Sequence, residues 1–285
     1  MAVLLGLGAA LIYGTADFIG GLVTRRNPVA RVVFLSKIAG LLFLLAAVPL
    51  LIGAEDIDRA WVWGLAAGAA GSFGIALLYR GLARGRMSVV APITAVLAAV
   101  IPVAFGLALG ERPSALQMIG VAVAIVAVAL ISAAPDPSAT ADPSTSRRLA
   151  RSGVLDALAS GVGLGGFLIL VTRAGDDAGS WPLVAARVSE IAIMGGLVAV
   201  TRARIRPDRG TGKAIAVTGV LDSLGTLLYL IGTTLELVSL MVVLASLYPA
   251  ATVLLARVFL QDRLTRVQLA GLILALAGVV MLAAG

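Results

Sequence analysis

Long apolar stretches separated by short polar turns run through the whole chain. Each has about the 20 apolar residues that a helix needs to cross the hydrocarbon core of a bilayer. None shows the ten-residue alternation of a membrane β-barrel, and a lipid-exposed helix satisfies its own backbone hydrogen bonds. The pattern therefore predicts an all-α polytopic membrane protein with ten transmembrane helices. The expected segments are 2–23, 29–52, 60–82, 87–109, 114–133, 153–172, 181–201, 213–235, 237–260 and 265–284.

The two halves of the chain share one long repeat. Residues 88–133 align with residues 239–284 at a constant shift of 151 and without a gap. Within the repeat, Gln117 falls on Gln268, and an acidic residue followed by arginine recurs in the central turn. A repeated pair of membrane-length segments is typical of a transporter built from two halves.

Weaker echoes extend the duplication to the earlier segments. The triplet Leu77-Leu78-Tyr79 returns as Leu227-Leu228-Tyr229, and Arg31 returns as Arg187 in a matching Ala-Arg-Val triplet. We therefore expect five helices in each half. An odd number of helices inverts the second half in the membrane, an arrangement that permits alternating access around a central site.

The repeat also predicts the domain organisation. The first five-helix repeat is expected at 1–133 and the second at 153–285, with a polar linker at 134–152. The linker is rich in Pro, Ser, Thr and Asp and lacks an apolar period, which favours a disordered hinge.

Composition narrows the chemistry. The 285 residues are 60% hydrophobic and only 13% charged, about half the charge of a soluble domain. The chain has no cysteine and no histidine, so disulfides, thiol chemistry and zinc-type sites are excluded, and any proton coupling must use carboxylates. The net charge of +7 lies mostly in the turns, where membrane topology explains it better than nucleic-acid binding.

Loop charge predicts the orientation. The loops that follow the odd-numbered segments hold 15 basic residues, whereas the opposite loops hold three, Arg59, Arg112 and Arg173. Basic residues stay on the cytoplasmic side, so both termini are expected to face outward. The 15 residues are Arg25, Arg26, Arg80, Arg84, Arg86, Arg147, Arg148, Arg151, Arg202, Arg204, Arg206, Arg209, Lys213, Arg263 and Arg266.

Ionisable side chains inside the predicted spans are the first candidates for a site, because a charge in a membrane is costly and usually functional. Asp17 lies among glycines and either binds a cation or proton in a cavity or pairs with a basic residue near the interface. Arg187 and Glu190 are three residues apart, so they form an internal salt bridge or face a substrate together. Lys37 needs a carboxylate partner or a water-filled cavity, and Arg31 and Arg187 are expected to line a gate because they match in the two repeats.

Polar residues in the third and eighth segments complete the candidates. Asp222 falls on Ser72 at a shift of 150, which indicates a polar layer shared by both halves. Tyr79 and Tyr229 are also 150 apart, and each is either a cavity hydroxyl or a residue of the interfacial belt.

These residues together resemble a known family. The chain is similar to the drug/metabolite transporter superfamily, EamA type, which has ten helices in two five-helix repeats. The resemblance implies transport of small solutes through a central cavity, often coupled to protons. It also implies cytoplasmic termini in many members, whereas the loop charge here predicts the reverse. The matching motifs are Tyr13-Gly14, Arg31 and Arg187, Tyr79 and Tyr229, Gly110-Glu111-Arg112 with Gln117 and Gly120, and the second copy Gln261-Asp262-Arg263.

We therefore predict a secondary active transporter of small organic solutes (metabolites, amino acids or drugs) in the plasma membrane, as a monomer or homodimer. Protons or a second solute would be the coupling partner. An exporter would rely on the buried carboxylates, whereas an antiporter or importer of anionic metabolites would rely on the buried cations. A membrane-embedded lipid or isoprenoid enzyme is the alternative from another class. It would need clustered carboxylates around a metal, and Asp176-Asp177 lacks a spaced second acid, so we expect no enzyme, metal or cofactor.

Overall fold

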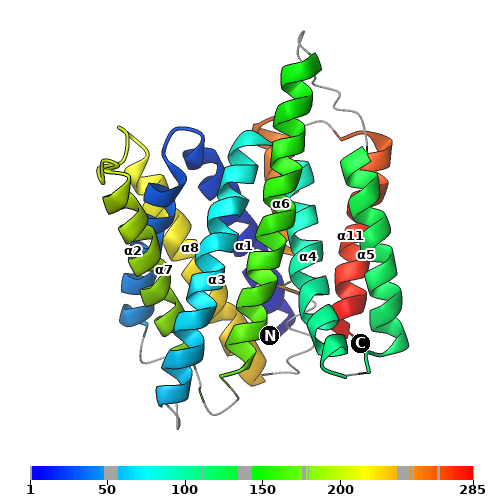
Figure 1. Cartoon of the computed structure of the whole chain (residues 1–285), viewed down its shortest axis with the longest axis horizontal. Helices are drawn as coiled ribbons and strands as arrows, with labels where there is room; N and C mark the ends of the chain where they lie inside the picture. The colour runs from blue at the N-terminus through cyan, green and yellow to red at the C-terminus, as the bar shows by residue number, and fades with distance from the viewer. Residues whose placement is uncertain are drawn as a thin grey trace.

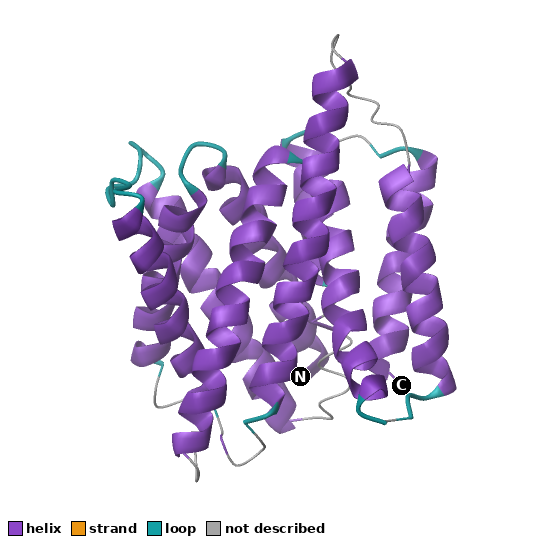
Figure 2. Cartoon of the chain, viewed as in Figure 1, coloured by secondary structure: helices purple, strands orange, loops and turns teal. Residues whose placement is uncertain are grey.

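The computed structural model describes residues 2–47, 57–110, 112–133, 143–174, 178, 180–235, 244–245, 247–261 and 264–284. These residues form ten helices and no strand (Figure 2). The helices of the first half are α1 (Ala2–Thr24), α2 (Val29–Ala46), α3 (Ile57–Arg84), α4 (Met87–Ala108) and α5 (Ala115–Ala133). Those of the second half are α6 (Pro143–Thr172), α7 (Trp181–Val200), α8 (Gly212–Leu235), α10 (Tyr248–Phe259) and α11 (Arg266–Ala284).

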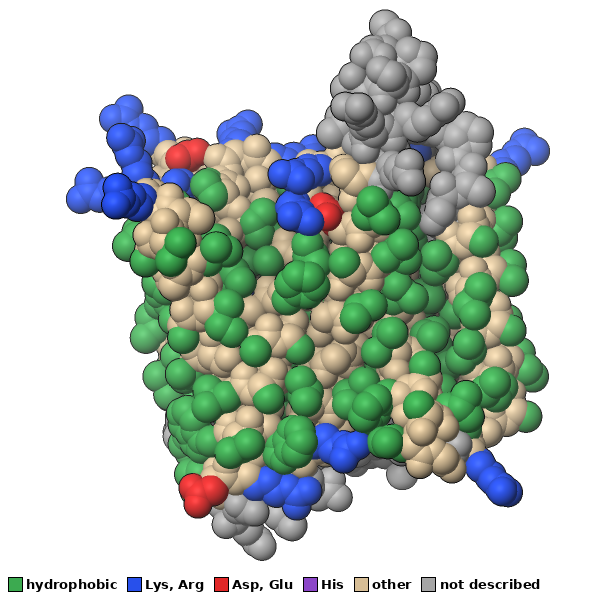
Figure 3. All heavy atoms as spheres, in the orientation of Figure 1, with side chains coloured by type: hydrophobic (Ala, Val, Ile, Leu, Met, Phe, Trp, Pro, Cys, Tyr) green, Lys and Arg blue, Asp and Glu red, His purple; other side chains and the backbone are tan. Residues whose placement is uncertain are grey.

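Six of these helices are long and apolar enough to cross a membrane, namely α1, α2, α3, α4, α6 and α7. Shorter apolar stretches lie in α5, α10 and α11. Figure 3 shows an apolar belt around the visible face, with charged side chains gathered at its two ends. This is the surface expected of helices whose outer faces meet lipid.

The repeated turn owes its shape to local hydrogen bonds that occur in both halves. Ser114 and Gln117 cap the start of α5 reciprocally, with backbone-to-side-chain bonds of 2.9 and 3.1 Å. Thr265 and Gln268 do the same before α11, at 3.0 and 3.1 Å. Each pair is a capping box, which satisfies backbone N–H groups that a helix start leaves free. The shared glutamine seen in the sequence repeat is therefore a helix-start signal; the acidic residues Glu111 and Asp262 of the turns lie outside the described residues.

The ends of the preceding helices are also equivalent. Gly110, after α4, has a φ of +87°, and Gln261, after α10, has a φ of +55°. The two positions are 151 apart, so the turn needs a left-handed residue in both copies. Glycine adopts this conformation freely, whereas glutamine does so at a steric cost.

The helices of the two halves interdigitate. The third helix of each half packs against the first two helices of the other: α3 contacts α6 and α7, and α8 contacts α1 and α2. Correspondingly, α4 contacts α6, α10 contacts α1, and α5 packs on α11. Figure 1 shows α6 beginning at the end of the molecule where α1 finishes, so the equivalent first helices run in opposite directions. The packing therefore has the inverted two-fold character expected from the repeat.

Two helices begin away from the predicted boundaries. α6 begins at Pro143, inside the stretch 134–152 that we assigned to a polar linker, and residues 134–142 lie outside the described part of the chain. Proline suits the first position of a helix, and the Arg, Leu and Ala residues that follow favour helix over coil. The polar composition of 143–152 thus belongs to a helix extension, which rises above the neighbouring helices in Figure 1. α10 begins at Tyr248, late in the predicted segment 237–260, of which residues 237–243 and 246 lie outside the described part.

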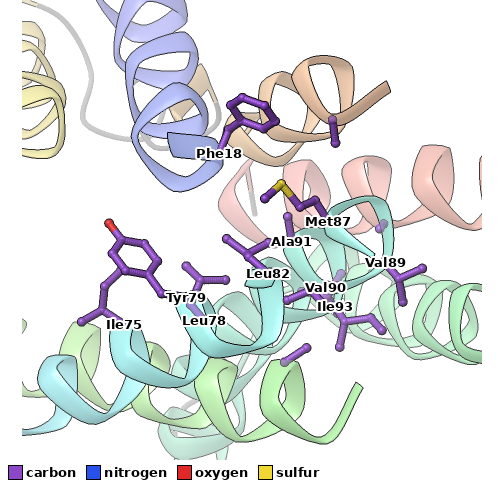
Figure 4. Packing of buried hydrophobic residues seen from close by; sticks show 14 of the residues in the cluster. Phe18, Ile75, Leu78, Tyr79, Leu82, Met87, Val89, Val90, Ala91 and Ile93 are labelled. Carbon is purple, nitrogen blue, oxygen red and sulfur yellow. The ribbon is translucent and has the colours of Figure 1, made fainter. Parts of the chain in front are cut away.

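A buried apolar cluster lies where α1, α3 and α4 meet. Phe18, Leu82, Met87 and Ile93 belong to it, and all are almost completely buried. Figure 4 shows Tyr79 at its edge, with the phenol hydroxyl directed away from the apolar side chains. Tyr79 links this cluster to the polar region described next, because it lies within electrostatic range of Asp17 and Asp222.

Candidate functional site

Four charged side chains from three helices meet inside the helix bundle. Lys37 comes from α2, Arg187 and Glu190 from α7, and Asp222 from α8. The Nζ of Lys37 lies 3.1 Å from Asp222 Oδ2 and 3.4 Å from Glu190 Oε2. Arg187 Nη1 lies 2.8 Å from Glu190 Oε2, and its Nη2 lies 2.6 Å from Asp222 Oδ2. We call these four residues the central charged cluster.

Neutrality makes this cluster tolerable in an apolar interior. It holds two cations and two carboxylates, and each cation contacts both carboxylates. Lys37 and Glu190 are buried, whereas the side chain of Asp222 keeps 20% of its surface exposed. A buried charge is destabilising unless it is paired and hydrogen-bonded, and this arrangement pairs all four. The predicted Arg187–Glu190 salt bridge is present, and Lys37 has the carboxylate partner that it was expected to need.

Glycine contacts define how the two halves correspond. Gly74 of α3 packs on Leu164 of α6, and Gly225 of α8 packs on Tyr13 of α1. Gly225 lies 151 residues after Gly74, and Leu164 lies 151 residues after Tyr13, so the two contacts are equivalent. The third and eighth helices therefore follow the same shift as the long sequence repeat.

This register corrects the expected match of Asp222 with Ser72. At a shift of 151, Ser72 corresponds to Ser223, and Asp222 corresponds to Gly71. Ser72 and Ser223 are both fully buried, and neither hydroxyl has a hydrogen-bond partner among the described residues. The polar layer shared by the two halves is thus a pair of serines, and the carboxylate of Asp222 is particular to the second half.

The cations of the cluster are structural counterparts. Gly68 of α3 approaches α7 at the residue before Arg187, and Gly219 of α8 approaches α2 at the residue before Lys37. Gly68 and Gly219 are 151 apart, so Lys37 stands where Arg187 stands in the other half. The expected equivalence of Arg187 with Arg31 is therefore wrong: similar triplets at the helix starts suggested it, but helix packing pairs Arg187 with Lys37.

Asp17 lies near this cluster but outside its ion pairs. The side chain is half-buried on α1, within electrostatic range of Lys37 and Asp222. It forms no hydrogen bond or salt bridge with any other described residue. Asp17 therefore remains the carboxylate of this region that has no cationic partner in the described structure.

Three of the four tyrosines of the chain lie near these carboxylates, and the fourth lies near one of those three. Tyr13 donates a hydrogen bond of 3.0 Å to Thr226, which in turn donates to the carbonyl of Asp222. Tyr79 lies within electrostatic range of Asp17 and Asp222, and Tyr248 lies within range of Asp17. Tyr229 lies within range of Tyr13. Whether Tyr79 and Tyr229 face a cavity or belong to the interfacial belt stays a prediction, and at the shift of 151 the two are not equivalent, since Tyr79 corresponds to Leu230.

Tyr248 is a candidate that our sequence reasoning missed. It begins α10, and its backbone carbonyl lies against Gly14 of α1. A usable signal existed, because membrane tyrosines concentrate at the interfaces and Tyr248 falls in the middle of the predicted segment 237–260.

The comparisons with known proteins agree with this architecture. The sequence model of the EamA-like transporter family matches residues 1–133 and again residues 151–284. The chain belongs to the EamA-like transporter family. Its membership, with the helical spans, confirms the predicted polytopic all-α membrane fold and the resemblance to the drug/metabolite transporter superfamily. The family implies a membrane transporter of small solutes.

A solved structure shares the fold of this EamA-like transporter. That structure, described as "Crystal structure of protein", has 16% sequence identity and a TM-score of 0.59, and the alignment covers 98% of this chain and 95% of that one. At this identity the likeness concerns the fold alone. A search of curated proteins returned no significant match.

At one end of this EamA-like transporter, a polar network joins the two halves. Asn27 donates to Thr211 at 3.2 Å and accepts both from Arg31 at 3.2 Å and from the backbone N–H of Asp208 at 3.1 Å. Arg31 also pairs with Asp208, at 3.3 Å. We call Asn27, Arg31, Asp208 and Thr211 the Asn27 latch. It ties the turn between α1 and α2 to the turn before α8, and it places Arg31 away from the central charged cluster.

At the opposite end of the transporter, different contacts join the turns that are equivalent to those of the Asn27 latch. Arg59, at the start of α3, donates two hydrogen bonds of 3.3 and 3.1 Å to the carbonyl of Arg173, after α6. A small buried cluster of Ala60, Ala174 and Ala178 lies beside it, with Trp63 and Trp181 packed against these alanines. One closure is therefore polar and the other largely apolar.

The remaining buried acid has a structural partner. The carboxylate of Asp156 of α6 accepts two hydrogen bonds from Arg80 of α3, one of 3.0 Å from Nε and one of 2.6 Å from Nη2. The pair joins the two halves at their surface, where the side chain of Arg80 is 40% exposed. Among the described residues, no group of three carboxylate, histidine or cysteine side chains is arranged to hold a metal ion.

Proposed function

We propose that this chain is a secondary active transporter that exports small organic solutes across the plasma membrane by alternating access. The central charged cluster and Asp17 would form the solute site, and a proton or a second solute would be the coupling partner. The inverted packing supports the proposal, because two interdigitated halves can exchange conformations around a site that both contribute to.

The observation that carries this proposal is the position of the central charged cluster. Its four charges come from helices of both halves, and Asp222 remains partly exposed although the cluster lies inside the bundle. Charges inside a membrane protein mark solute and ion pathways by default, because a purely structural core would be more stable without them. A solute that competes for these ion pairs can therefore change how the two halves hold together.

Charge at the two ends supports an outward orientation of both termini. The termini lie at one end of the bundle in Figure 1, and basic side chains are present at both ends in Figure 3 but more densely at the other end. The native chain has no cysteine, so single cysteines can be introduced as topology reporters. We expect a membrane-impermeant maleimide to label Ala284→Cys on intact cells and to label Arg204→Cys only after lysis. The reverse pattern would refute the orientation.

The anion-exchanger alternative has less support. Lys37 and Arg187 are each engaged by two carboxylates, and Arg31 is engaged by Asp208 in the Asn27 latch. An anionic solute would have to displace an internal carboxylate to reach either central cation. The enzyme alternative depended on Asp176-Asp177, which lie outside the described residues; we propose that the chain carries out transport and no chemical conversion.

Reconstitution tests the proposal directly. Purified protein in liposomes is loaded with a pool of labelled amines, amino acids and organic acids, and efflux is followed with and without an imposed pH gradient. We expect at least one compound to cross faster than in protein-free liposomes, and Asp222→Asn to abolish that flux while the protein stays folded. Asp58→Asn is the matched control, because Asp58 is exposed at the start of α3. Undiminished flux in both Asp222→Asn and Asp17→Asn would sink the site assignment.

A further inference from the structure

The charges around the solute site do not balance. The central charged cluster is neutral, since Lys37 and Arg187 offset Glu190 and Asp222. Asp17 adds a carboxylate that has no salt-bridge partner within the described residues. Its neighbour Lys37 is committed to Asp222 and Glu190, so an ionised Asp17 leaves the region with one negative charge. In an apolar interior that charge calls for a proton or a cation.

The shape of α1 places tyrosines beside this carboxylate. Gly20, three residues after Asp17, lies against the phenol end of the Tyr79 ring of α3. Gly14, three residues before it, lies against the backbone of Tyr248 of α10. Residues three apart on a helix share a face, so Asp17 stands between the two helices that carry these tyrosines.

Two further tyrosines lie close by. Tyr13 precedes Asp17 by one helical turn on α1 and packs with its ring against Gly225 of α8, and Tyr229 lies near Tyr13. Figure 4 shows that the hydroxyl of Tyr79 points away from the apolar cluster formed with Leu82 and Met87. Tyr13, Tyr79 and Tyr248 therefore lie around the part of α1 that carries Asp17, a carboxylate without an ion-pair partner among the described residues.

This combination favours one class of ligand. Aromatic rings attract organic ammonium groups through their negative faces, and a carboxylate supplies the opposite charge. Neither feature attracts an anion. A carboxylate-bearing solute would also have to break the bonds that hold Lys37 and Arg187 to Glu190 and Asp222.

We propose that the substrate of this transporter is an organic monocation, an amine or quaternary ammonium compound, whose charged nitrogen binds at Asp17 between the rings of Tyr13, Tyr79 and Tyr248. The inference rests on the proposed function and names the substrate class of the same site. The central charged cluster then serves as a neutral wall, and Asp17 supplies the charge that selects the substrate.

Four probes that share a phenyl ring test this assignment. Benzyltrimethylammonium is a cation, benzyl alcohol is neutral, benzoate is an anion and phenylalanine is a zwitterion. Binding of each to the purified full-length protein in detergent is measured by titration calorimetry. We expect benzyltrimethylammonium to bind at least about tenfold more tightly than the other three, because only it gains a charge-assisted contact without breaking one.

Variants locate the binding to the proposed residues. Asp17→Asn should weaken benzyltrimethylammonium binding by about tenfold or more. Asp17→Glu keeps the carboxylate and should therefore keep most of the affinity. Tyr248→Leu removes a ring and should weaken binding about threefold to tenfold, whereas Tyr248→Phe should keep most of the affinity. Asp58→Asn makes the same chemical change at an exposed site and should leave binding unchanged.

The outcomes separate this inference from the proposed function. Tighter binding of benzoate or phenylalanine than of benzyltrimethylammonium would overturn the ammonium site, and so would unchanged binding in Asp17→Asn. If benzoate or phenylalanine then crosses liposomes in a manner that needs Asp222, the transporter proposal stands and only the substrate class fails. If benzyltrimethylammonium binds through Asp17 but neither it nor any other compound crosses the liposome membrane, the binding site stands and the transport proposal fails.

Discussion

Lys37 and Arg187 occupy equivalent places in the two halves and contact the same two carboxylates. Arg187 lies 2.6 Å from Asp222, whereas Lys37 lies 3.1 Å from it. Both carboxylates come from the second half: Asp222 corresponds to Gly71, and Glu190 corresponds to Gly40 at the shift of 150 that relates Lys37 to Arg187. The two cations obey the two-fold relation between the halves, whereas the two acids have no counterpart in the first half. The site is therefore asymmetric, although the helix packing around it is two-fold.

Removing one cation should destabilise the protein through the acids left behind. Arg187→Met leaves Glu190 and Asp222 with Lys37 alone, and breaking a buried ion pair costs about 3–5 kcal/mol. We expect a clear fall in the thermal unfolding midpoint in detergent. The double variant Arg187→Met/Asp222→Asn restores neutrality and should recover most of the lost stability without recovering transport. Equal loss in the single and double variants would show that the charges are not coupled.

The crossing of α2 and α8 depends on a residue without a side chain. A Cβ at Gly219 would overlap the carbonyl of Ser36, so Gly219→Ala should cost about 1–3 kcal/mol through overpacking. Gly196 of α7 is the matched control, because a Cβ there meets nothing within 4 Å. Gly196→Ala should be neutral or stabilise the helix by up to about 1 kcal/mol. Thermal unfolding of both variants distinguishes a packing effect from a general intolerance of alanine.

The Asn27 latch should control access to its end of the molecule. Thr211 is buried within the latch, whereas Lys213 nearby is exposed. In the background Asp208→Ala, a cysteine at position 211 should react with a maleimide about fivefold faster, as expected for the loss of bonds worth about 1 kcal/mol. A cysteine at position 213 should react at the same rate in both backgrounds. An unchanged rate at position 211 would show that the latch does not limit opening.

The pair of Arg80 and Asp156 should affect stability and not transport. Arg80→Met leaves the buried Asp156 carboxylate without its hydrogen bonds, at a cost of about 1–3 kcal/mol. Asp156→Asn in the same chain should recover part of that loss. Flux per folded molecule in liposomes should match the wild type, since neither residue touches the central charged cluster. A large fall in flux at normal stability would place this pair in the transport mechanism.

Much of the architecture could be predicted from the residue pattern. Eight of the described helices begin within three residues of the predicted segments, because hydrophobicity and helix-start signals such as Ser114 and Thr265 act locally. α6 begins earlier than predicted, since its first turns carry a polar composition that also suits a linker, and α10 begins later. The site was predictable only as a set of ionisable residues: Lys37, Arg187, Glu190 and Asp222 were candidates, but Tyr248 was not.

By itself, the sequence determined the helical class, the inverted duplication and the unequal charge of the two ends, because these depend on local hydrophobicity and on counting. Only the tertiary structure decided which charges from different helices meet. Lys37 lies 185 residues from its partner Asp222. Their contact depends on the positions along α2, α7 and α8 at which these helices pack on their neighbours. Close packing at Gly68 and Gly219 fixes those positions. The same packing separates Arg31 from Arg187 and leaves Asp17 without a cationic partner among the described residues. Asp17 is therefore the residue at which the substrate chemistry of this transporter can be tested.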